Sequence, residues 1–166
     1  MRSSSRRRKS PDLRVRPARR TDFDALMELE RRVFATDRLS RRSLRRLLMS
    51  PSALVTVAEV GGRLAGAAVV LFRAHATVGR LYSIAVAPPM SGKGVAVALL
   101  AAAERAAAAR KCRCIRLEVH ETNAAAIARY RKSGYAEFGR HARYYQDGGD
   151  ALRFEKPLGG PRSRAS

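Results

Sequence analysis

Leu81-Tyr-Ser-Ile-Ala-Val-Ala-Pro-Pro-Met-Ser-Gly-Lys-Gly-Val-Ala-Val-Ala-Leu-Leu100 is the stretch that decides the fold. It reads as an apolar strand, a turn rich in proline and glycine, and a helix that extends to about Arg110. Gly92 and Gly94 fall where the turn becomes the helix. The first amides of a helix lack internal acceptors and the helix dipole adds positive potential, so this junction suits a phosphate group. Lys93 adds a mobile cation. The simpler alternative is a turn that only reverses the chain.

The segments before this stretch show strand and helix patterns in alternation. Residues 13–17 alternate apolar and polar side chains and predict a first strand. Thr21 is expected to cap a helix with an apolar stripe, and a second helix is expected from Ser40 to Pro51. Residues 54–60 and 63–72, joined by Gly61-Gly62, predict a hairpin that leads to the central strand, 79–87.

The segments after it continue the alternation. A strand is expected at about residues 114–120, a short helix at 123–132 ended by Gly134, and two strands near 136–139 and 151–156 that pair as a final hairpin. The order β-α-α-β-β-β-α-β-α-β-β indicates an α/β sheet with helices on both faces. With 166 residues, the chain has the length of one domain.

The formal net charge of +20 is unevenly distributed. Residues 1–20 carry nine Lys/Arg against one Asp, a contribution of +8. The charge indicates either attraction to an anionic partner or a proteome biased toward arginine and alanine. We find neither an apolar run of bilayer length nor a secretory signal. Cys112 and Cys114 are separated by one residue, and we read them as neither a metal pair nor a disulfide; we therefore expect no metal site and no disulfide. Two reduced thiols fit a cytoplasmic protein, and we expect no membrane contact.

Residues 91–96, Ser-Gly-Lys-Gly-Val-Ala, resemble the pyrophosphate loop of the GNAT N-acetyltransferases, usually (Gln/Arg)-x-x-Gly-x-(Gly/Ala). Gly94 and Ala96 match this pattern, whereas Ser91 stands where glutamine or arginine is expected. Residues 117–130 and 133–135 are similar to the second signature of the family, most plainly in its ribosomal-protein-alanine (RimI) type, and residues 144–153 also resemble that type. The resemblance covers roughly residues 13 to 157.

The resemblance implies a GNAT acyl-CoA N-acyltransferase fold, with a mixed, mostly antiparallel sheet and helices on both faces. One domain would span residues 13–157, between a disordered basic arm, 1–12, and a loose tail, 158–166. The central strand and the strand after the long helix would splay apart to hold acetyl-CoA. The implied cofactor-binding residues are the main chain of Ile84, Ala85 and Val86, the loop Ser91, Gly92, Lys93, Gly94, Val95, Ala96 and Val97, and the side chain of Asn123. Asn123 is equally a good helix cap.

Two residues are candidates for acid–base chemistry. Glu118 shares one strand face with Arg116 and His120, and the resemblance implies that it is the general base that accepts the amine proton. Alternatively, it is a glutamate paired with Arg116 or another arginine. Tyr130 would be the general acid for the departing thiolate, or else a core tyrosine. We leave His120 out of the site. Tyr144 or Tyr145 would line the acceptor channel.

The resemblance therefore predicts an acetyl-CoA-dependent N-acetyltransferase that acts by direct attack in a ternary complex. The acceptor would be a primary amine, foremost a protein N-terminal α-amine, and the partner a protein or peptide, ribosomal proteins included. Residues 34–43 lie where relatives build the acceptor side. One alternative is a non-catalytic module of the same fold that binds nucleic acid or the ribosome, with nonspecific contacts through the basic arm. Another is an enzyme that acetylates small-molecule amines.

Overall fold

The computed structural model describes residues 12–159 and contains one seven-stranded sheet with four α-helices. Nearly all of the expected basic arm and most of the expected C-terminal tail lie outside the described residues. The strands are β1 (Leu13–Pro17), β2 (Ala53–Val60), β3 (Arg63–Phe72), β4 (Val78–Val86), β5 (Cys114–His120), β6 (Ala136–His141) and β7 (Ala151–Pro157). The α-helices are α1 (Phe23–Val33), α2 (Arg41–Met49), α3 (Val95–Ala109) and α4 (Ala124–Lys132), and two short 3-10 helices are η1 (Arg20–Asp22) and η2 (Pro88–Met90).

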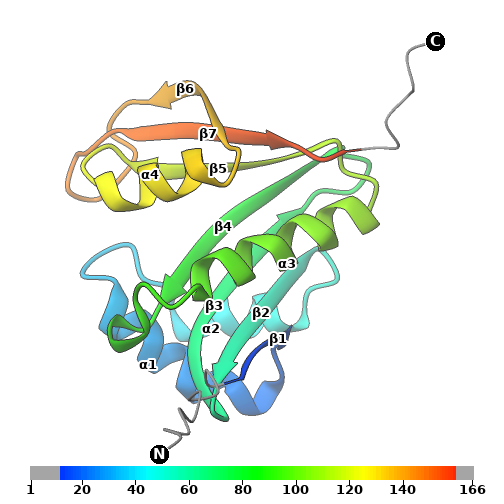
Figure 1. Cartoon of the computed structure of the whole chain (residues 1–166), viewed down its shortest axis with the longest axis vertical. Helices are drawn as coiled ribbons and strands as arrows, with labels where there is room; N and C mark the ends of the chain where they lie inside the picture. The colour runs from blue at the N-terminus through cyan, green and yellow to red at the C-terminus, as the bar shows by residue number, and fades with distance from the viewer. Residues whose placement is uncertain (1–11, 160–166) are drawn as a thin grey trace, which may run out of the picture.

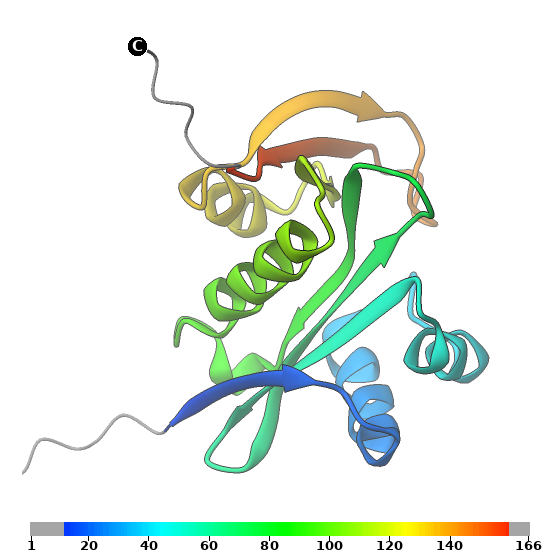
Figure 2. The same ribbon diagram turned by 90° about the vertical axis from the view of Figure 1, so that its right-hand side faces the viewer.

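The strands are ordered β1-β2-β3-β4-β5-β7-β6, and only the pair β4–β5 is parallel. Helices α1 and α2 pack on one face of β2–β4, while α3 and α4 contribute to the core on the opposite face (Figures 1 and 2). The predicted element order, final hairpin and mixed sheet covered on both faces are therefore confirmed. Among the described residues, no helix combines the length and apolar character that crossing a bilayer would require.

The start of α1 differs from the expectation. Thr21 lies inside η1, and α1 begins at Phe23, so the prediction that Thr21 caps this helix was wrong. The carboxylate of Asp22 accepts the N–H of Arg19 at 2.6 Å and binds the guanidinium of Arg16 at 2.8 Å. These contacts organise a tight turn before the helix. By contrast, α2 begins beside Ser40 as predicted, and the Ser40 hydroxyl caps it by accepting the N–H of Ser43 at 3.0 Å.

Two glycines let α3 lie close against the sheet. A Cβ atom at Gly66 would lie 2.7 Å from the carbonyl oxygen of Ala85 and 2.9 Å from a methyl of Val95. At Gly79 it would lie 3.2 Å from the Cβ of Ala107, near the other end of the helix. Any side chain at Gly66 would push the first turn of α3 outward. The close packing thus fixes the N-terminus of α3 beside the end of β4.

Strands β4 and β5 pair only over Val78–Leu81 and Cys114–Leu117, and then they diverge (Figure 1). A bulge in β4 marks the start of the divergence, because Val69 is opposite Ser83 whereas Val70 is opposite Leu81, which leaves Tyr82 unpaired. A bulge of this kind bends a strand and is common beside active sites. The expected splay is confirmed, and it opens the sheet at its centre.

Candidate active site

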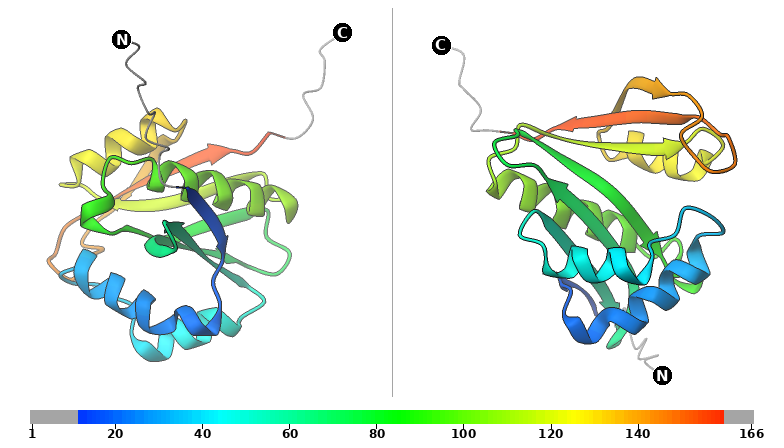
Figure 3. Two further views of the ribbon diagram at one scale, coloured as in Figure 1. Left: turned by 60° about the horizontal axis from the view of Figure 1, so that its bottom comes forward. Right: turned by 180° about the vertical axis from the view of Figure 1, so that it is seen from behind.

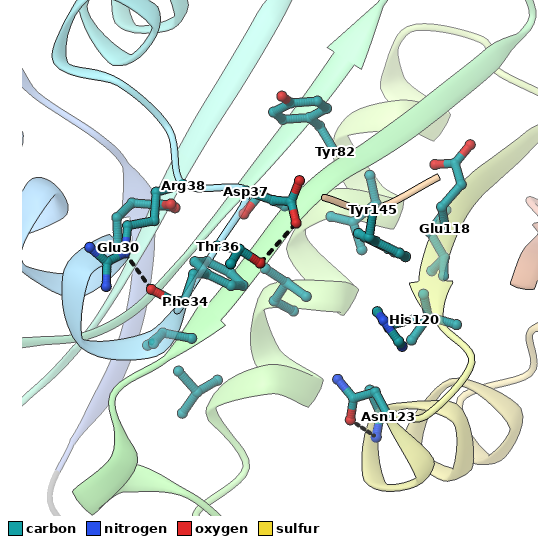
Figure 4. Close-up of a pocket in the computed structure, with 18 of the residues that line it drawn as sticks. Glu30, Phe34, Thr36, Asp37, Arg38, Tyr82, Glu118, His120, Asn123 and Tyr145 are labelled. Atoms are coloured by element: carbon teal, nitrogen blue, oxygen red, sulfur yellow. Dashed lines mark hydrogen bonds between the residues drawn. The ribbon is translucent and has the colours of Figure 1, made fainter. Parts of the chain in front are cut away.

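A cleft of about 750 Å³ opens where β4 and β5 diverge. Its walls come from both sides of the sheet: α1 and the α1–α2 connection, β4, β5, α4 and the β6–β7 connection (Figure 3). The sequence-predicted residues that line it are Ile84, Val86, Ser91, Glu118, Asn123, Tyr130, Tyr144 and Tyr145. Figure 4 shows Glu118, His120 and Asn123 along one side and Glu30, Phe34 and Arg38 on the opposite side.

The β4 wall presents main-chain groups to the cleft. The N–H of Ala87 donates to the carbonyl of Ala65 in β3 at 2.8 Å, and antiparallel pairing alternates, so Ala85 also bonds toward β3. The main-chain N–H and C=O groups of Ile84 and Val86 therefore point toward the gap. Of the three residues predicted here, the structure brings Ile84 and Val86 to the cleft, while Ala85 is 4% exposed in the core.

The loop after β4 ends in free amides at the start of α3. Gly94 is the N-cap with φ +79°, in the left-handed region that favours glycine. The first helical bond runs from the N–H of Ala98 to the carbonyl of Gly94 at 3.0 Å. The N–H groups of Val95, Ala96 and Val97 are thus left without a helical acceptor.

The surroundings of these amides suit an anion such as pyrophosphate. Gly92 also has a positive φ, +76°, and a Cβ on it would meet no atom within 4 Å, so the loop is open to solvent. Lys93 is exposed at its edge. Ser91 lines the cleft, whereas Gly92, Lys93, Gly94, Val95, Ala96 and Val97 lie beyond its rim.

Glu118 lies in the fork between the diverging strands, with 13% of its side chain exposed. Arg80 of β4 donates to its carboxylate at 3.2 Å, and the Nε of Arg153 lies 3.8 Å from the second oxygen. Arg116 does not reach it and instead binds Glu155 at 2.9 Å. Glu118 is therefore both a cleft residue and the partner of an arginine, although of Arg80 rather than Arg116.

A chain of contacts joins Glu118 to the β6–β7 connection. Arg80 also donates to the hydroxyl of Tyr144 at 2.6 Å. Burial raises the pKa of Tyr144 above its usual value, and burial likewise raises the pKa of Tyr145. Both tyrosines line the cleft, as expected for at least one of them.

His120, which the sequence analysis set aside, lines the cleft as well. Its Nε2 is 2.8 Å from Asp147, its Nδ1 accepts the N–H of Thr122 at 3.2 Å, and its ring stacks on Tyr145 with centroids 4.9 Å apart. A Cβ on Gly149 would lie 2.2 Å from Nε2, so the absent side chain makes this approach possible. His120 therefore holds the β6–β7 connection in place.

Tyr130 and Asn123 belong to the α4 side. Tyr130 is 5% exposed, and burial raises its pKa to about 12. Within residues 12–159 we find no hydrogen-bond partner for its hydroxyl, although the residue lines the cleft. Asn123 lines the cleft too and caps α4, because its side-chain oxygen accepts the N–H of Ala126 at 3.2 Å. The two uses foreseen for Asn123 are therefore compatible in space.

Glu30 is a cleft residue that sequence reasoning missed. It is 8% exposed on α1, and its carboxylate accepts the N–H of Leu39 at 3.0 Å, which ties the α1–α2 connection to the helix. Burial raises the pKa of Glu30. The signal was present in the sequence, because Glu30 lies four residues after Leu26 and three before Val33, within the core-facing stripe of α1.

The described residues contain no group of three or more His, Cys, Asp or Glu side chains arranged to hold a metal ion. The cleft instead combines free main-chain amides, a carboxylate and a phenol. Such groups can bind a phosphate-containing thioester, accept a proton from an amine and donate a proton to a leaving group.

Comparison with known proteins agrees with this geometry. The model of the Acetyltransferase (GNAT) family matches residues 23–135, and the chain belongs to this family. An acetyltransferase of Pectobacterium atrosepticum is 32% identical over 125 residues, which cover 74% of this chain and 87% of the relative. The chain is accordingly an N-acetyltransferase, and enzymes of its family use acetyl-CoA.

Two solved structures illustrate the range of acceptors. The ribosomal-protein-alanine N-acetyltransferase from Brucella melitensis is 26% identical with a TM-score of 0.77, and the match covers 87% of this chain and 99% of that one. Nourseothricin acetyltransferase is also 26% identical, with a TM-score of 0.74 and coverage of 89% and 99%. The two likenesses therefore do not by themselves choose between a protein acceptor and a small-molecule acceptor.

Proposed function

We propose that this enzyme transfers the acetyl group of acetyl-CoA to the N-terminal α-amine of a protein, in one step within a ternary complex. The observation that carries the proposal is the splayed gap, which has free main-chain groups of β4 on one side and Glu118 and Tyr130 on the other. The likeness to a ribosomal-protein-alanine N-acetyltransferase supports an α-amine, that of a ribosomal protein included, as the acceptor.

The residues of β4 and of the α3 N-terminus would bind the cofactor. Main-chain groups of Ile84 and Val86 are free to bond the pantetheine amides like an added strand, whereas Ala85 already pairs with β3. The amides of the loop 91–97 would hold the pyrophosphate, with Lys93 as a mobile cation beside it. Asn123 would contact the cofactor while it caps α4. When bound, acetyl-CoA supplies an activated acyl group as a thioester.

Glu118 would accept the proton of the attacking amine, directly or through a water molecule. The need is real, since an α-amine has a pKa of about 8 and only its neutral form attacks. The amine nitrogen forms a bond to the thioester carbon, the carbon–sulfur bond then breaks, and the sulfur leaves as a thiolate. A free N–H of β4 would stabilise the negative charge that develops on the carbonyl oxygen.

Tyr130 would stabilise the leaving group. With its pKa raised to about 12, the phenol stays protonated at any working pH, but it is a weaker acid than an ordinary tyrosine. The thiol of a leaving group has a pKa of about 8.5. We therefore expect Tyr130 to stabilise the departing thiolate by donating a hydrogen bond to it as the carbon–sulfur bond breaks.

The test is a panel of acceptors assayed with acetyl-CoA, in which release of the free thiol is followed. The panel holds peptides with free N-termini, the same peptides with blocked N-termini and an internal lysine, and small amines including aminoglycoside-like and streptothricin-like compounds. We expect turnover with free N-termini. Preference for small amines would favour the second candidate, which the likeness to nourseothricin acetyltransferase supports.

A thermal-unfolding measurement separates both candidates from a non-catalytic module. A ligand that binds only the native state raises the free energy of unfolding, by roughly 2.7 kcal/mol at a concentration 100 times its Kd. The unfolding temperature rises with it. Saturating acetyl-CoA should therefore stabilise the protein. No stabilisation, together with no transfer to any amine, would contradict the proposed function and leave the binding module as the better account.

A further inference from the structure

The outer face of α2 is made of arginine. Leu44 is 1% exposed and packs into the core with the half-buried Leu47 and Leu48. The opposite side carries four exposed arginines, which we term the α2 arginine face: Arg41, Arg42, Arg45 and Arg46. At 3.6 residues per turn these four side chains fall within an arc of about 140°. Apart from Met49, the helix therefore separates its apolar and cationic sides.

Within residues 12–159, carboxylates neutralise little of this charge. Helix α2 itself contains no acidic residue. Arg41 alone of the four reaches a carboxylate, that of Asp24 at 4.0 Å, and this carboxylate is almost fully exposed. Arg41 also repels Arg45 one turn away, and Arg42 repels Arg46 in the same way. Such an arrangement costs stability unless an anion lies against it.

Part of the face is already held in place. The guanidinium groups of Arg41 and Arg45 lie 4.8 Å and 5.0 Å from the ring centroid of Phe23 in α1. Contacts with the ring restrict the two side chains, so less conformational entropy remains to be lost when they bind an anion. Arginine also presents a planar fork of donors that matches a phosphate group.

The burial pattern argues against a membrane or an apolar partner. A helix that inserts into a bilayer surface needs a free apolar side, and here that side is packed against the sheet. Met49 is 68% exposed, but it is a single apolar side chain among the arginines. The face therefore fits a polyanion that is bound through its phosphates.

Its position relates it to the cleft. Residues Phe34–Leu39 line the acceptor side, and Ser40, the next residue, caps α2. Because α2 follows directly on this wall of the cleft, a surface bound to α2 would lie beside the acceptor side.

We propose that the α2 arginine face binds the phosphate backbone of structured RNA. This contact would place the acceptor side of the cleft next to a protein that is bound to the same RNA. The choice of RNA over other polyanions rests on the proposed function, because a ribosomal acceptor is surrounded by RNA. The binding itself needs no catalysis and is tested without acetyl-CoA.

The experiment measures binding of a fluorescent RNA hairpin to the full chain at several salt concentrations. The test variant carries Arg42→Gln, Arg45→Gln and Arg46→Gln. A matched control carries Arg63→Gln, Arg105→Gln and Arg113→Gln, three exposed arginines outside α2 that make no ion pair within residues 12–159 and whose replacement removes the same charge. Residues 1–11 are identical in all proteins, so their contribution cancels.

The test variant should bind at least tenfold more weakly at moderate salt. The slope of log affinity against log salt should become shallower by about 2 to 3, as expected when three phosphate contacts are lost. The control triple should keep the wild-type slope, and acetyl transfer to a short peptide should be unchanged in the test variant. Arg42→Gln with Arg46→Gln serves as a second variant, because within the described part of the chain neither side chain makes a hydrogen bond, an ion pair or a ring contact, and both are exposed.

Three results would overturn the proposal. Equal losses in the two triple variants would mean that only net charge matters. Equal affinity for a DNA duplex of the same length, or binding to anionic vesicles that depends on the same arginines, would reject RNA as the partner. A wild-type chain that binds RNA through α2 but acetylates no amine would instead contradict the proposed function and leave the docking surface intact.

Discussion

The β4 wall of the cleft offers main-chain groups, whereas the β5–α4 wall offers side chains. On β4, the groups that face the gap are the N–H and C=O of Ile84 and Val86, followed by the amides at the start of α3. On β5 and α4, the groups are the carboxylate of Glu118 and the phenol of Tyr130. The difference implies that one wall tolerates most substitutions that keep its backbone, and that the other does not.

The two walls should therefore respond to mutation in different kinetic constants. A side chain that moves a proton acts on the transition state, so its loss lowers kcat. A main-chain seat for the cofactor acts on binding, so its distortion raises the KM for acetyl-CoA. Variants of each wall, paired with control variants of the same residue type elsewhere, test whether this division is real.

The largest effect is expected for Glu118→Gln, which keeps the shape of the side chain and removes the proton acceptor. The rate at neutral pH should fall by roughly 10²–10⁴, the range typical of general acid–base catalysis. The deficit should shrink as pH rises above about 8, because more of the α-amine is then already neutral. Steady-state rates from pH 6.5 to 9.5 measure both features.

Glu155→Gln is the control for that variant. Glu155 lies on the same side of the sheet and binds Arg116 as Glu118 binds Arg80, but it does not line the cleft. Its replacement should leave the rate near wild type. If the two glutamine variants have the same rate, Glu118 is only an ion-pair partner and does not act as the general base on β5.

Tyr130→Phe should have the next largest effect, a fall in kcat of about 10², at the low end for acid catalysis because the raised pKa weakens the acid. The KM for acetyl-CoA should change little, since the ring remains. In the wild type, the pKa of about 12 keeps the phenol protonated, so activity should not decline between pH 9 and 10.5 through loss of this proton. A decline there that the phenylalanine variant lacks would contradict the raised pKa.

Tyr135→Phe is the matched control on the same side of the core. Among residues 12–159, the buried hydroxyl of Tyr135 has no hydrogen-bond partner, and its ring lies edge-on to that of Tyr130 with centroids 5.7 Å apart. Its removal should leave kcat unchanged and should not destabilise the protein, because an unsatisfied buried hydroxyl costs about 1–3 kcal/mol. Equal activity of both phenylalanine variants would make Tyr130 a core residue only.

Gly94→Val tests the β4 wall. Because Gly94 has φ +79°, a β-branched residue there is strained, at a cost of roughly 1–3 kcal/mol, and the amides after it should shift. We expect the KM for acetyl-CoA to rise about tenfold or more, with a smaller change in kcat. Gly62→Val carries the same kind of strain at φ +77° in the β2–β3 turn, away from the cleft, and should cost stability only. If Gly94→Val and Gly62→Val had the same KM for acetyl-CoA, the loop would not be part of the cofactor site.

The fold could be predicted well from the sequence because the residues at its turns and helix ends have strong conformational preferences. The Gly61-Gly62 turn and the Gly92 and Gly94 junction each enforce one local conformation and lie where they were expected, and α2 begins beside Ser40 as expected. The failure at Thr21 has a physical reason, since the Asp22 carboxylate accepts the N–H of Arg19 and binds Arg16, and these contacts hold Arg20–Asp22 in a 3-10 turn so that α1 begins at Phe23.

The site was less predictable, because its contacts join residues far apart in the chain. Nothing in the local pattern indicates that Arg80 would bind both Glu118 and Tyr144. Nor does it indicate that His120 would contact Asp147 beside Gly149, where a Cβ atom would not fit. The orientation of Ala85 toward β3 depends on the register of the β3–β4 pair, which the sequence does not fix to one residue. Main-chain contributions of this kind leave little trace in side-chain identity.

The smallest expected effect is that of Ser91→Arg, which restores the side chain usual at this position in the family. Ser91 is exposed and lines the cleft beside the free amides, so an arginine there can reach a bound phosphate without disturbing the core. Exposed ion pairs contribute only about 0.2–1 kcal/mol, so the Kd for acetyl-CoA should fall by no more than about fivefold. Titration calorimetry at low and high salt measures it, and the gain should shrink as salt screens the charge. Unchanged affinity would mean that the backbone amides already bind the phosphates fully, which would sharpen the contrast between a main-chain wall and a side-chain wall.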